Sequence, residues 1–352
     1  MVFQPDQPSV TTKKRHTGYW QRLLAALLWC YLFGLFGWAM LRWLAGDRWL
    51  WLFLLNTFAF YLFVPLPLVV LSALFMRSRQ LWIGVTLATV LAVVLYGPLW
   101  FPYRGATADG PTLTVMTWNL LTFHQEPERA LAALQASDAD VIALQELNLP
   151  IAAAIAQELR DNYPYQLLLP HEGFTGMGLI SRYPLAAQAA MFTERWVGDP
   201  QLATLTLDGT ELLLVNIHAL PPDTSTETIR ERERQAQRLH EVAEQAAMPV
   251  IVMGDLNAGD MSVAYEILTQ DLQDAWRVCG WGTGHTFPGA DSPGSSRPHI
   301  FGIAVPMWLI RIDYIFFSDE IQCTEAMIGP WDGVSDHRSV ITRLLVTPTA
   351  MH

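Results

Sequence analysis

The feature that most limits how this chain can fold is a set of three long apolar runs in its first third. Leu23–Met40, Leu50–Met76 and Leu81–Tyr103 contain no Asp, Glu, Lys or Arg. Each is long enough to cross the hydrocarbon core of a bilayer as a helix, which takes about 20 residues. We therefore predict three transmembrane helices. The second run exceeds one crossing, so we expect it to tilt or to kink at Pro65 and Pro67 rather than to form two spans.

The residues that flank these runs predict an orientation. Tryptophans lie near the proposed helix ends, as is typical of membrane interfaces: Trp20, Trp43, Trp49, Trp51, Trp82 and Trp100. One side would carry Lys13, Lys14, Arg15, Arg22, Arg77 and Arg79, and the other Arg42, Arg48 and Arg104. The positive-inside rule then places the N-terminus in the cytoplasm and residues 105–352 outside it. A cleaved signal peptide is the alternative for the first run, but that run is long and two more follow it.

A change in composition divides the chain into a membrane anchor, residues 1–104, and a second domain, residues 105–352. The anchor holds nine of the 22 Lys and Arg residues and two of the 33 Asp and Glu residues. The remaining 13 basic and 31 acidic residues give the second domain a formal charge of −18. Because nucleic-acid-binding proteins usually carry a basic surface, this charge argues against broad contact with a phosphate backbone. A divalent cation could still bring an anionic substrate to an acidic cleft.

The three cysteines place few constraints on the protein. Cys30 lies in the first apolar run. Cys279 and Cys323 could pair if their segments face an oxidising compartment, or they could remain small buried thiols. The spacing of cysteine and histidine does not match a zinc site.

Short apolar strands alternate with amphipathic helices in the second domain. Strands are predicted near 113–119, 138–147, 176–185, 211–220, 249–257, 311–318 and 338–346, and helices at 126–135, 150–160 and 226–247. The spacing between strands is mixed. This pattern favours an α/β sandwich over a doubly wound parallel sheet.

Several of these strands end in an amide, a carboxylate or an imidazole. The side chains are Asn119, Glu146, His218, Asp255, Asn257, Asp313, Asp336 and His337. Asp255 and Asn257 are two residues apart at the end of PVIVMGDLN, so continued extended backbone would point them the same way. Taken alone, GDLN is equally typical of a turn after a strand. Recurrence along the chain instead indicates a site built on the rim of a sheet.

The ordered motifs WN, QE, NxH, GDxN, RIDYI and SDH resemble those of the endonuclease/exonuclease/phosphatase superfamily, which includes DNase I-like nucleases, sphingomyelinases and inositol polyphosphate phosphatases. The resemblance extends from about Leu113 to Val346. It implies a four-layered α/β/β/α sandwich with a Mg²⁺- or Mn²⁺-dependent phosphoesterase site. One departure is Leu121, where several family nucleases carry an Asp two positions after the first-motif Asn. This departure weakens the comparison with abasic-site nucleases specifically.

The resemblance also suggests a role for each residue. Glu146 would be the principal metal ligand, with Asn119 and Asp336 beside the metal or its water, since Mg²⁺ prefers carboxylates and water. A solvated Glu or a turn-forming Asn after a strand is the plain structural alternative for those positions.

The other polar residues are expected to carry out the chemistry. Asp255 would orient or deprotonate the attacking water, and Asn257 would hold the phosphoryl group. His218 would donate to a phosphate oxygen. His337 would act with a carboxylate partner, which in the family is the one in the RIDYI strand, here Asp313. Histidines that fall in loops, His124 among them, are expected to be solvated rather than catalytic.

These observations predict a multi-pass membrane protein whose extracytoplasmic domain hydrolyses a phosphate ester or pyrophosphate. Tethering favours a lipid or lipid-linked phosphate as the substrate. A nuclease acting outside the cytoplasm is the alternative enzyme, and the acidic charge argues against it. A binding or scaffold protein with a degenerate domain is the alternative without catalysis; it would bind its partner normally in the presence of a chelator.

Overall fold

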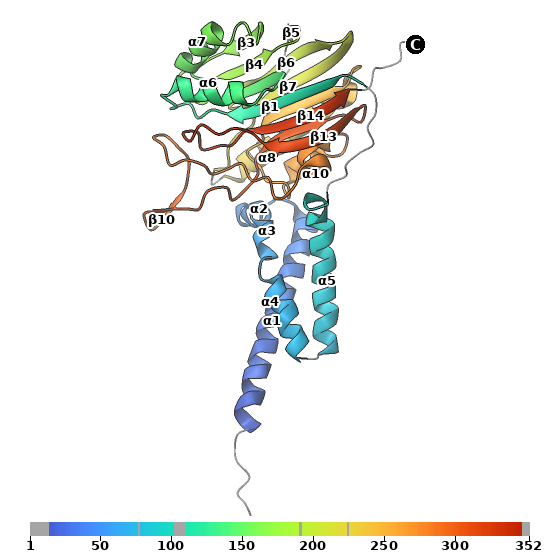
Figure 1. Cartoon of the computed structure of the whole chain (residues 1–352). Coiled ribbons are helices and arrows are strands. Elements are labelled where there is room, and N and C mark those ends of the chain that lie inside the picture. Colours follow the sequence, from blue (N-terminus) through green and yellow to red (C-terminus); the bar gives the residue numbers. More distant parts are fainter. Residues whose placement is uncertain (1–13, 77, 102–109, 190–191, 224, 347–352) are drawn as a thin grey trace, which may run out of the picture. The chain divides into compact units, whose positions relative to one another are not determined.

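The computed structural model describes residues 14–76, 78–101, 110–189, 192–223 and 225–346. Its contacts separate two compact units (Figure 1). The helical unit comprises Met1–Leu44 and Phe60–Leu95, and the sheet unit comprises Ala45–Ala59 and Tyr96–His352. The segment Ala45–Ala59 therefore belongs to the sheet unit, although it precedes the predicted boundary. That boundary, between residues 104 and 105, lies outside the described residues.

The helical unit contains helices of the length and composition expected of membrane spans. Its elements are α1 (Lys14–Ala45), α3 (Ala59–Leu62), α4 (Leu66–Met76) and α5 (Arg79–Tyr96). The candidate spans are Gly18–Ala45, Ala59–Met76 and Arg79–Leu99, which agrees with the predicted count of three. The charges predicted to flank them at Lys13, Arg77 and Arg104 lie outside the described residues.

The second apolar run differs from the single kinked span that we predicted. Its first part forms a separate helix, α2 (Leu50–Thr57), which belongs to the sheet unit. The remaining 18 residues, Ala59–Met76, are sufficient for a span by themselves. Mean hydropathy could not distinguish the two parts, because an apolar helix that packs against protein has the same composition as one that faces lipid.

The sheet unit contains two six-stranded sheets, in the orders β13-β14-β1-β2-β4-β3 and β5-β6-β7-β8-β12-β9. The first comprises β1 (Thr112–Asn119), β2 (Val141–Gln145), β3 (Tyr165–Leu169), β4 (Met177–Ser181), β13 (Ile321–Ile328) and β14 (Val340–Val346). The second comprises β5 (Leu185–Gln188), β6 (Gly198–Leu207), β7 (Thr210–His218), β8 (Val250–Asp255), β9 (Gln273–Asp274) and β12 (Asp313–Phe317). A small hairpin joins β10 (His299–Ile300) to β11 (Ile303–Ala304).

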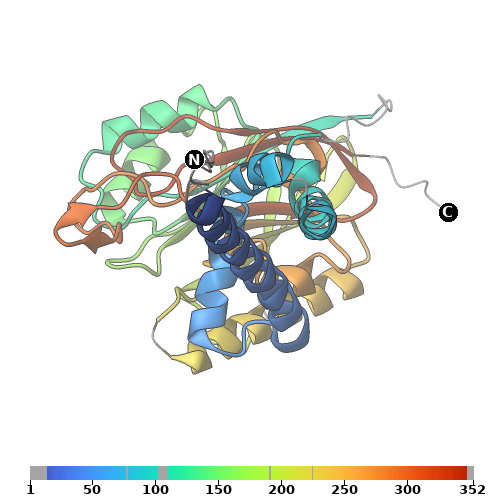
Figure 2. The same ribbon diagram turned by 90° about the horizontal axis from the view of Figure 1, so that it is seen from below.

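Helices cover the outer face of each sheet. Besides α2, the helices of this unit are η1 (Gly97–Leu99), α6 (Pro127–Ala136), α7 (Leu149–Glu158), α8 (Thr226–Gln245), α9 (Val263–Leu268) and α10 (Ala275–Cys279). Leu134 of α6 and Ile151 of α7 join the core on the first sheet. Leu239 of α8 and Leu268 of α9 join the core on the second. Figure 2 shows the two pairs, coloured green and gold, on opposite sides of the strands. The sheet unit is thus the predicted four-layered sandwich.

A buried polar network joins the facing sheets. Gln145 Nε2 donates to Asn216 Oδ1 at 2.7 Å, and Asn216 Nδ2 donates to the carbonyls of Leu144 and Gly178 at 3.1 and 3.0 Å. Buried amides must be satisfied to be tolerated, and satisfied networks favour one arrangement of a core. This network fixes β7, which ends at His218, against β2, which Glu146 directly follows.

A disulfide bond joins Cys279, at the end of α10, to Cys323 in β13. Their Cα atoms are 5.9 Å apart, which is the usual separation for a disulfide. The sequence had left this pairing open.

Candidate active site

Strand register brings three predicted residues of the second sheet together. β7 and β8 are parallel, and His218 lies opposite Asp255. β12 is antiparallel to β8, and Asp313 also lies opposite Asp255. Side chains in register on neighbouring strands point to the same face of a sheet. The last residues of β7 and β8 and the first residue of β12 therefore form one row.

The first sheet contributes two more residues, and Asn119 links them to that row. Asn119 ends β1, and Glu146 follows β2 with a φ of 54°, a left-handed conformation that is uncommon for residues other than glycine. Asn119 Nδ2 donates to Glu146 Oε1 at 3.1 Å and to Asp255 Oδ2 at 3.2 Å. The Thr122 amide donates to Glu146 Oε2 at 2.8 Å. One amide group therefore holds together two carboxylates that come from different sheets.

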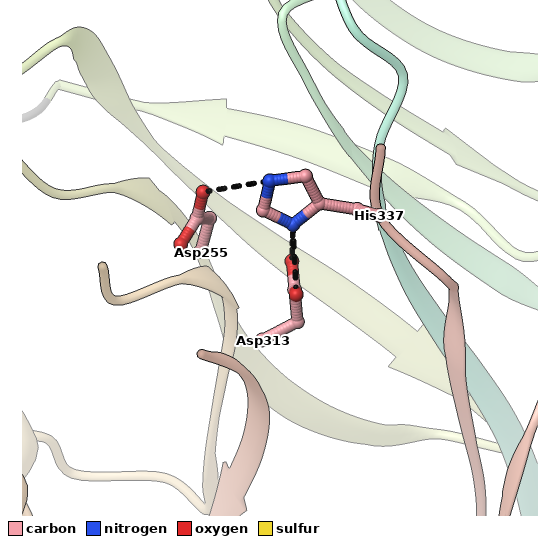
Figure 3. A group of neighbouring side chains, drawn as sticks. All are labelled: Asp255, Asp313 and His337. Atoms are coloured by element: carbon pink, nitrogen blue, oxygen red, sulfur yellow. Dashed lines mark hydrogen bonds and ion pairs between the residues drawn. The ribbon is translucent and has the colours of Figure 1, made fainter. Parts of the chain in front are cut away.

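His337 lies between two carboxylates (Figure 3). Its Nδ1 is 2.9 and 3.1 Å from the two oxygens of Asp313, and its Nε2 is 3.9 Å from Asp255 Oδ2. Burial alone lowers the pKa of His337, but Asp313, followed by Asp255 and Asp336, outweighs burial and raises this pKa to about 10. The ring is therefore a cation whose Nδ1 proton is held by Asp313. Its Nε2 proton remains available to donate.

The neighbours of Asp255 fix the orientation of its carboxylate. The backbone N–H of Asn257 donates to Asp255 Oδ1 at 2.8 Å. Asn257 Nδ2 lies 3.0 Å from the Ala219 carbonyl and 3.3 Å from Asp255 Oδ2. Burial, followed by the charge of Asp313, raises the pKa of Asp255 to about 7. A carboxylate with a raised pKa is a suitable general base near neutral pH.

His218 stands on the other side of Asp255 and is neutral. Its Nε2 is 3.7 Å from Asp255 Oδ2 and 4.0 Å from Glu146 Oε1. Burial, followed by the positive charge of His337, lowers the pKa of His218 to about 3. The two histidines therefore differ in charge: His337 is cationic, and His218 can offer a single neutral N–H.

Asp336 is buried close to this group, but a loop occupies one of its oxygens. Asp336 Oδ2 accepts from the Ser296 amide at 2.8 Å, from Ser296 Oγ at 2.9 Å and from Ser295 Oγ at 3.3 Å. Burial raises the pKa of Glu146, and the negative charge of Asp336 raises it further. The Glu146 carboxylate therefore lies where a cation would be stabilised.

The described residues offer two settings for a metal ion. Asp255, Asp313 and His337 place one ligand atom each within 4.8 Å of one another. In that group, however, the imidazole is already bonded to Asp313, and hard cations such as Mg²⁺ favour oxygen ligands. Glu146 offers oxygen alone and carries a carboxylate that burial disfavours as an anion. Its surroundings fit a hard cation better.

All eight predicted residues lie in or beside this group, and one loop prediction was wrong. His124 is fully buried rather than solvated, and its Nε2 lies 2.5 Å from Asp332 Oδ2. Its Nδ1 accepts from the Glu126 amide at 3.1 Å. A signal for burial was present in the neighbouring sequence, because Leu120 and Leu121 precede His124 in an apolar segment.

Comparisons with known proteins agree with this architecture. Residues 116–337, more than half of the chain, match the sequence profile of the Endonuclease/Exonuclease/phosphatase family. No curated protein sequence matches the chain. The structure resembles D. rerio TDP2 complexed with single strand DNA product, with a TM-score of 0.52 and 18% identity over 66% of this chain and 98% of that one.

Two further solved structures are similar. Truncated Caenorhabditis elegans TDP2 has a TM-score of 0.51 and 17% identity, covering 67% of this chain and 98% of that chain. The human Nocturnin catalytic domain with bound sulfate anion has a TM-score of 0.50 and 20% identity, covering 70% and 100%. At these identities the likeness shows the shared fold. Together with the family profile, it means that this chain belongs to the Endonuclease/Exonuclease/phosphatase family, whose members are metal-dependent phosphoesterases.

Proposed function

We propose that this protein is a membrane-anchored, Mg²⁺-dependent phosphoesterase that hydrolyses a phosphate ester or pyrophosphate bond of a lipid-linked substrate outside the cytoplasm. In this proposal, residues 1–104 form the anchor, apart from the segment that packs in the sheet unit, and residues 105–352 form the catalytic domain. The observation that supports the reaction type is that the Asn119 side chain donates to both Glu146 and Asp255, while the cationic His337 lies 3.9 Å from Asp255.

The residues divide the chemistry among them. Asp255 accepts a proton from the attacking water, since its raised pKa suits a general base. The backbone N–H of Asn257 donates to Asp255 Oδ1, so Oδ2 is the oxygen that faces the other site residues. His337 donates from Nε2 to a phosphoryl oxygen while Asp313 fixes Nδ1.

The remaining residues position the substrate and hold the metal. His218 donates a second, neutral hydrogen bond to the phosphoryl group, and the Asn257 side chain borders the same position. Glu146, with Asn119 and Asp336, would hold Mg²⁺. When bound, Mg²⁺ would polarise the phosphoryl oxygen and offset the charge that develops on it.

Two observations support a location outside the cytoplasm. The flanking Lys and Arg residues favour a cytoplasmic N-terminus. The disulfide between Cys279 and Cys323 is of a kind that persists in oxidising compartments. A topology reporter fused to the C-terminus should therefore be active only outside the cytoplasm. A reporter that is active only inside would contradict the orientation.

The substrate class follows from confinement and charge. Three candidate spans would keep the catalytic domain at a bilayer, where lipid phosphates are concentrated. Nucleic acid is the alternative substrate, since the structurally similar TDP2 was solved with a single strand DNA product. The formal charge of −18 on residues 105–352 opposes extended contact with DNA.

The test compares three substrates with the full-length protein in detergent, with Mg²⁺ or with EDTA. They are a polyprenyl pyrophosphate, a phospholipid or sphingomyelin, and plasmid DNA. Asp255→Asn should lose activity, whereas Asp161→Asn, a matched change at an exposed turn, should retain it. Mg²⁺-dependent cleavage of a lipid but not of DNA would support the proposal. Cleavage of DNA alone would refute the lipid assignment.

A further inference from the structure

A cavity of about 580 Å³ opens directly beside the proposed catalytic residues. Its polar wall is formed by Glu146, His218, Asp255, Asn257 and His337. Among the other lining side chains only Thr57 and Ser296 carry a polar group, and the rest are aliphatic, aromatic or glycine. The volume is typical of a site for a small organic ligand. The cavity therefore joins phosphate-binding chemistry to an apolar space.

Helix α2 and the residue after it supply part of this apolar wall. Phe53, Leu54, Thr57 and Phe58 line the cavity, although they precede the family domain by about 60 residues in sequence. Leu54 and Phe58 are four residues apart, which places them on the same side of the helix end. They retain 45% and 39% exposure, so their surfaces are available to a ligand. The family fold alone does not supply this wall.

Specific contacts fix α2 in the sheet unit. Asp47 Oδ2 accepts from the Val263 amide at 2.7 Å, and Asp47 Oδ1 accepts from Asn56 Nδ2 at 2.8 Å. The Arg232 guanidinium lies 4.5 Å from the centre of the Phe53 ring.

Arg232 connects this helix to the catalytic loop. Its Nη1 donates to the Asn257 carbonyl at 3.1 Å and to the Leu220 carbonyl at 3.3 Å. The Arg232 side chain is buried, so these contacts are shielded from water. One buried cation thus contacts both α2 and the loop that carries Asn257. These contacts fix the position of α2 relative to the proposed catalytic residues.

The position of α2 in the chain indicates what would occupy the cavity. Thr57, its last residue, is two residues before Ala59, the first residue of a candidate span. A segment that continues directly into a span is held at the membrane surface by the chain itself. The molecules available there with a phosphate at one end and hydrocarbon at the other are lipids. A nucleotide base would need hydrogen-bonding partners, and the apolar wall offers few.

We propose that α2 and the residue after it form a substrate-binding element, in which Leu54 and Phe58 bind the hydrocarbon chain next to the phosphate of a lipid substrate. This inference deepens the proposed function and rests on it. It assigns part of the selectivity for an apolar substituent to the segment between the first two candidate spans, beside the apolar residues that the family domain supplies.

The test measures binding rather than turnover, so that it does not depend on which bond is cleaved. Ethylphosphonate and hexylphosphonate carry the same non-hydrolysable headgroup and differ by four methylenes. Their dissociation constants are measured with full-length protein in nanodiscs with Mg²⁺. Each methylene that is buried should strengthen binding about fourfold, so hexylphosphonate should bind at least tenfold more tightly.

Matched variants identify the surface responsible. Leu54→Gln should reduce the ratio between the two dissociation constants at least threefold. Leu55→Gln is the control, because Leu55 has a similar exposure of 37% on the same helix and does not line the cavity. The control should keep the wild-type ratio.

Three results would overturn the inference: an unchanged ratio in Leu54→Gln, an equal loss in Leu55→Gln, or a thymidine dinucleotide that binds more tightly than hexylphosphonate and loses affinity in Leu54→Gln. Failure of the proposed function has a different signature. In that case the chain-length preference and its loss in Leu54→Gln would persist, while no lipid is hydrolysed in the substrate comparison.

Discussion

Asn119 provides the sharpest test of how the site is assembled. Among the described residues, it is the only one whose side chain donates to both Glu146 and Asp255. Asn119→Leu keeps the number and branching of the side-chain heavy atoms but removes both donated hydrogen bonds and the one that Oδ1 accepts from the backbone N–H of Leu121. Hydrogen bonds to charged groups contribute about 1.5–3 kcal/mol each. Because Asp255 has a pKa raised to about 7 and is partly protonated at neutral pH, we take the lower end for each bond.

The two donated hydrogen bonds alone then give an expected loss of at least about 3 kcal/mol in the free energy of unfolding of the sheet unit. For a domain of this size the loss corresponds to a fall in Tm of roughly 6–12 °C. The assay is thermal unfolding of the full-length protein in detergent with EDTA, followed by tryptophan fluorescence. Asn162→Leu, at an exposed turn, is the matched control. A shift for Asn119→Leu no larger than that of the control would refute this account of the site.

A second substitution at the same position tests the metal. Asn119→Asp adds a third carboxylate beside Glu146 and Asp255, so in EDTA it should destabilise at least as much as Asn119→Leu. If a cation binds at Glu146, added Mg²⁺ should raise the Tm of Asn119→Asp by more than it raises that of the wild type. An equal response of both proteins to Mg²⁺ would argue against a metal at this position.

Three other predictions follow from buried groups. Asp255→Asn should reduce turnover at least about 1000-fold, because it removes the proposed general base. The Tm should stay unchanged or rise, because the substitution removes a buried negative charge that the folded protein disfavours. A marked fall in Tm would contradict this. Asp274→Ala should lower the free energy of unfolding, measured with urea, by about 3–5 kcal/mol, because both oxygens of Asp274 accept from buried Arg311 at 2.9 and 2.7 Å. Asp274→Asn should lower it by less. Replacing Cys279 and Cys323 together by Ala should lower stability by about 4 kcal/mol, given their separation of 44 residues, and reductant should then have no further effect on the Tm.

The elements that were easiest to predict were those with a strong local pattern. Alternating and continuous apolar runs identified the strands that end at Asn119, His218 and Asp255. The polar and apolar faces of residues 226–247 identified α8, which ends at Gln245. Strands with less regular alternation, such as β6 and β13, were not predicted. β6 begins with Gly, Asp and Pro, which are typical of turns, and the pairing of β13 with β14 shifts register between Cys323 and Glu325, so the alternation is interrupted in both.

The site was predicted as a set of residues, and its relationships were not. The family resemblance implied that Asp313 is the carboxylate partner of His337, and the structure places Asp313 Oδ2 2.9 Å from His337 Nδ1. Nothing in the sequence indicated that Asn119 would donate to two carboxylates, or that Asp336 would be held by Ser295 and Ser296. Each contact joins segments far apart in the chain, so it depends on strand pairing, on the stacking of the two sheets or on the path of a loop.

By itself the sequence determined which side chains stand at the ends of the strands and which segments are too apolar to remain in water. Local periodicity and hydropathy are sufficient for both, because each is a property of neighbouring residues. Only the tertiary structure decided that the first eight residues of the second apolar run form α2 beside the candidate site residues, while the rest remains long enough for a span. The reason is physical: burial against protein and burial in lipid remove the same apolar surface from water, and only the partner differs.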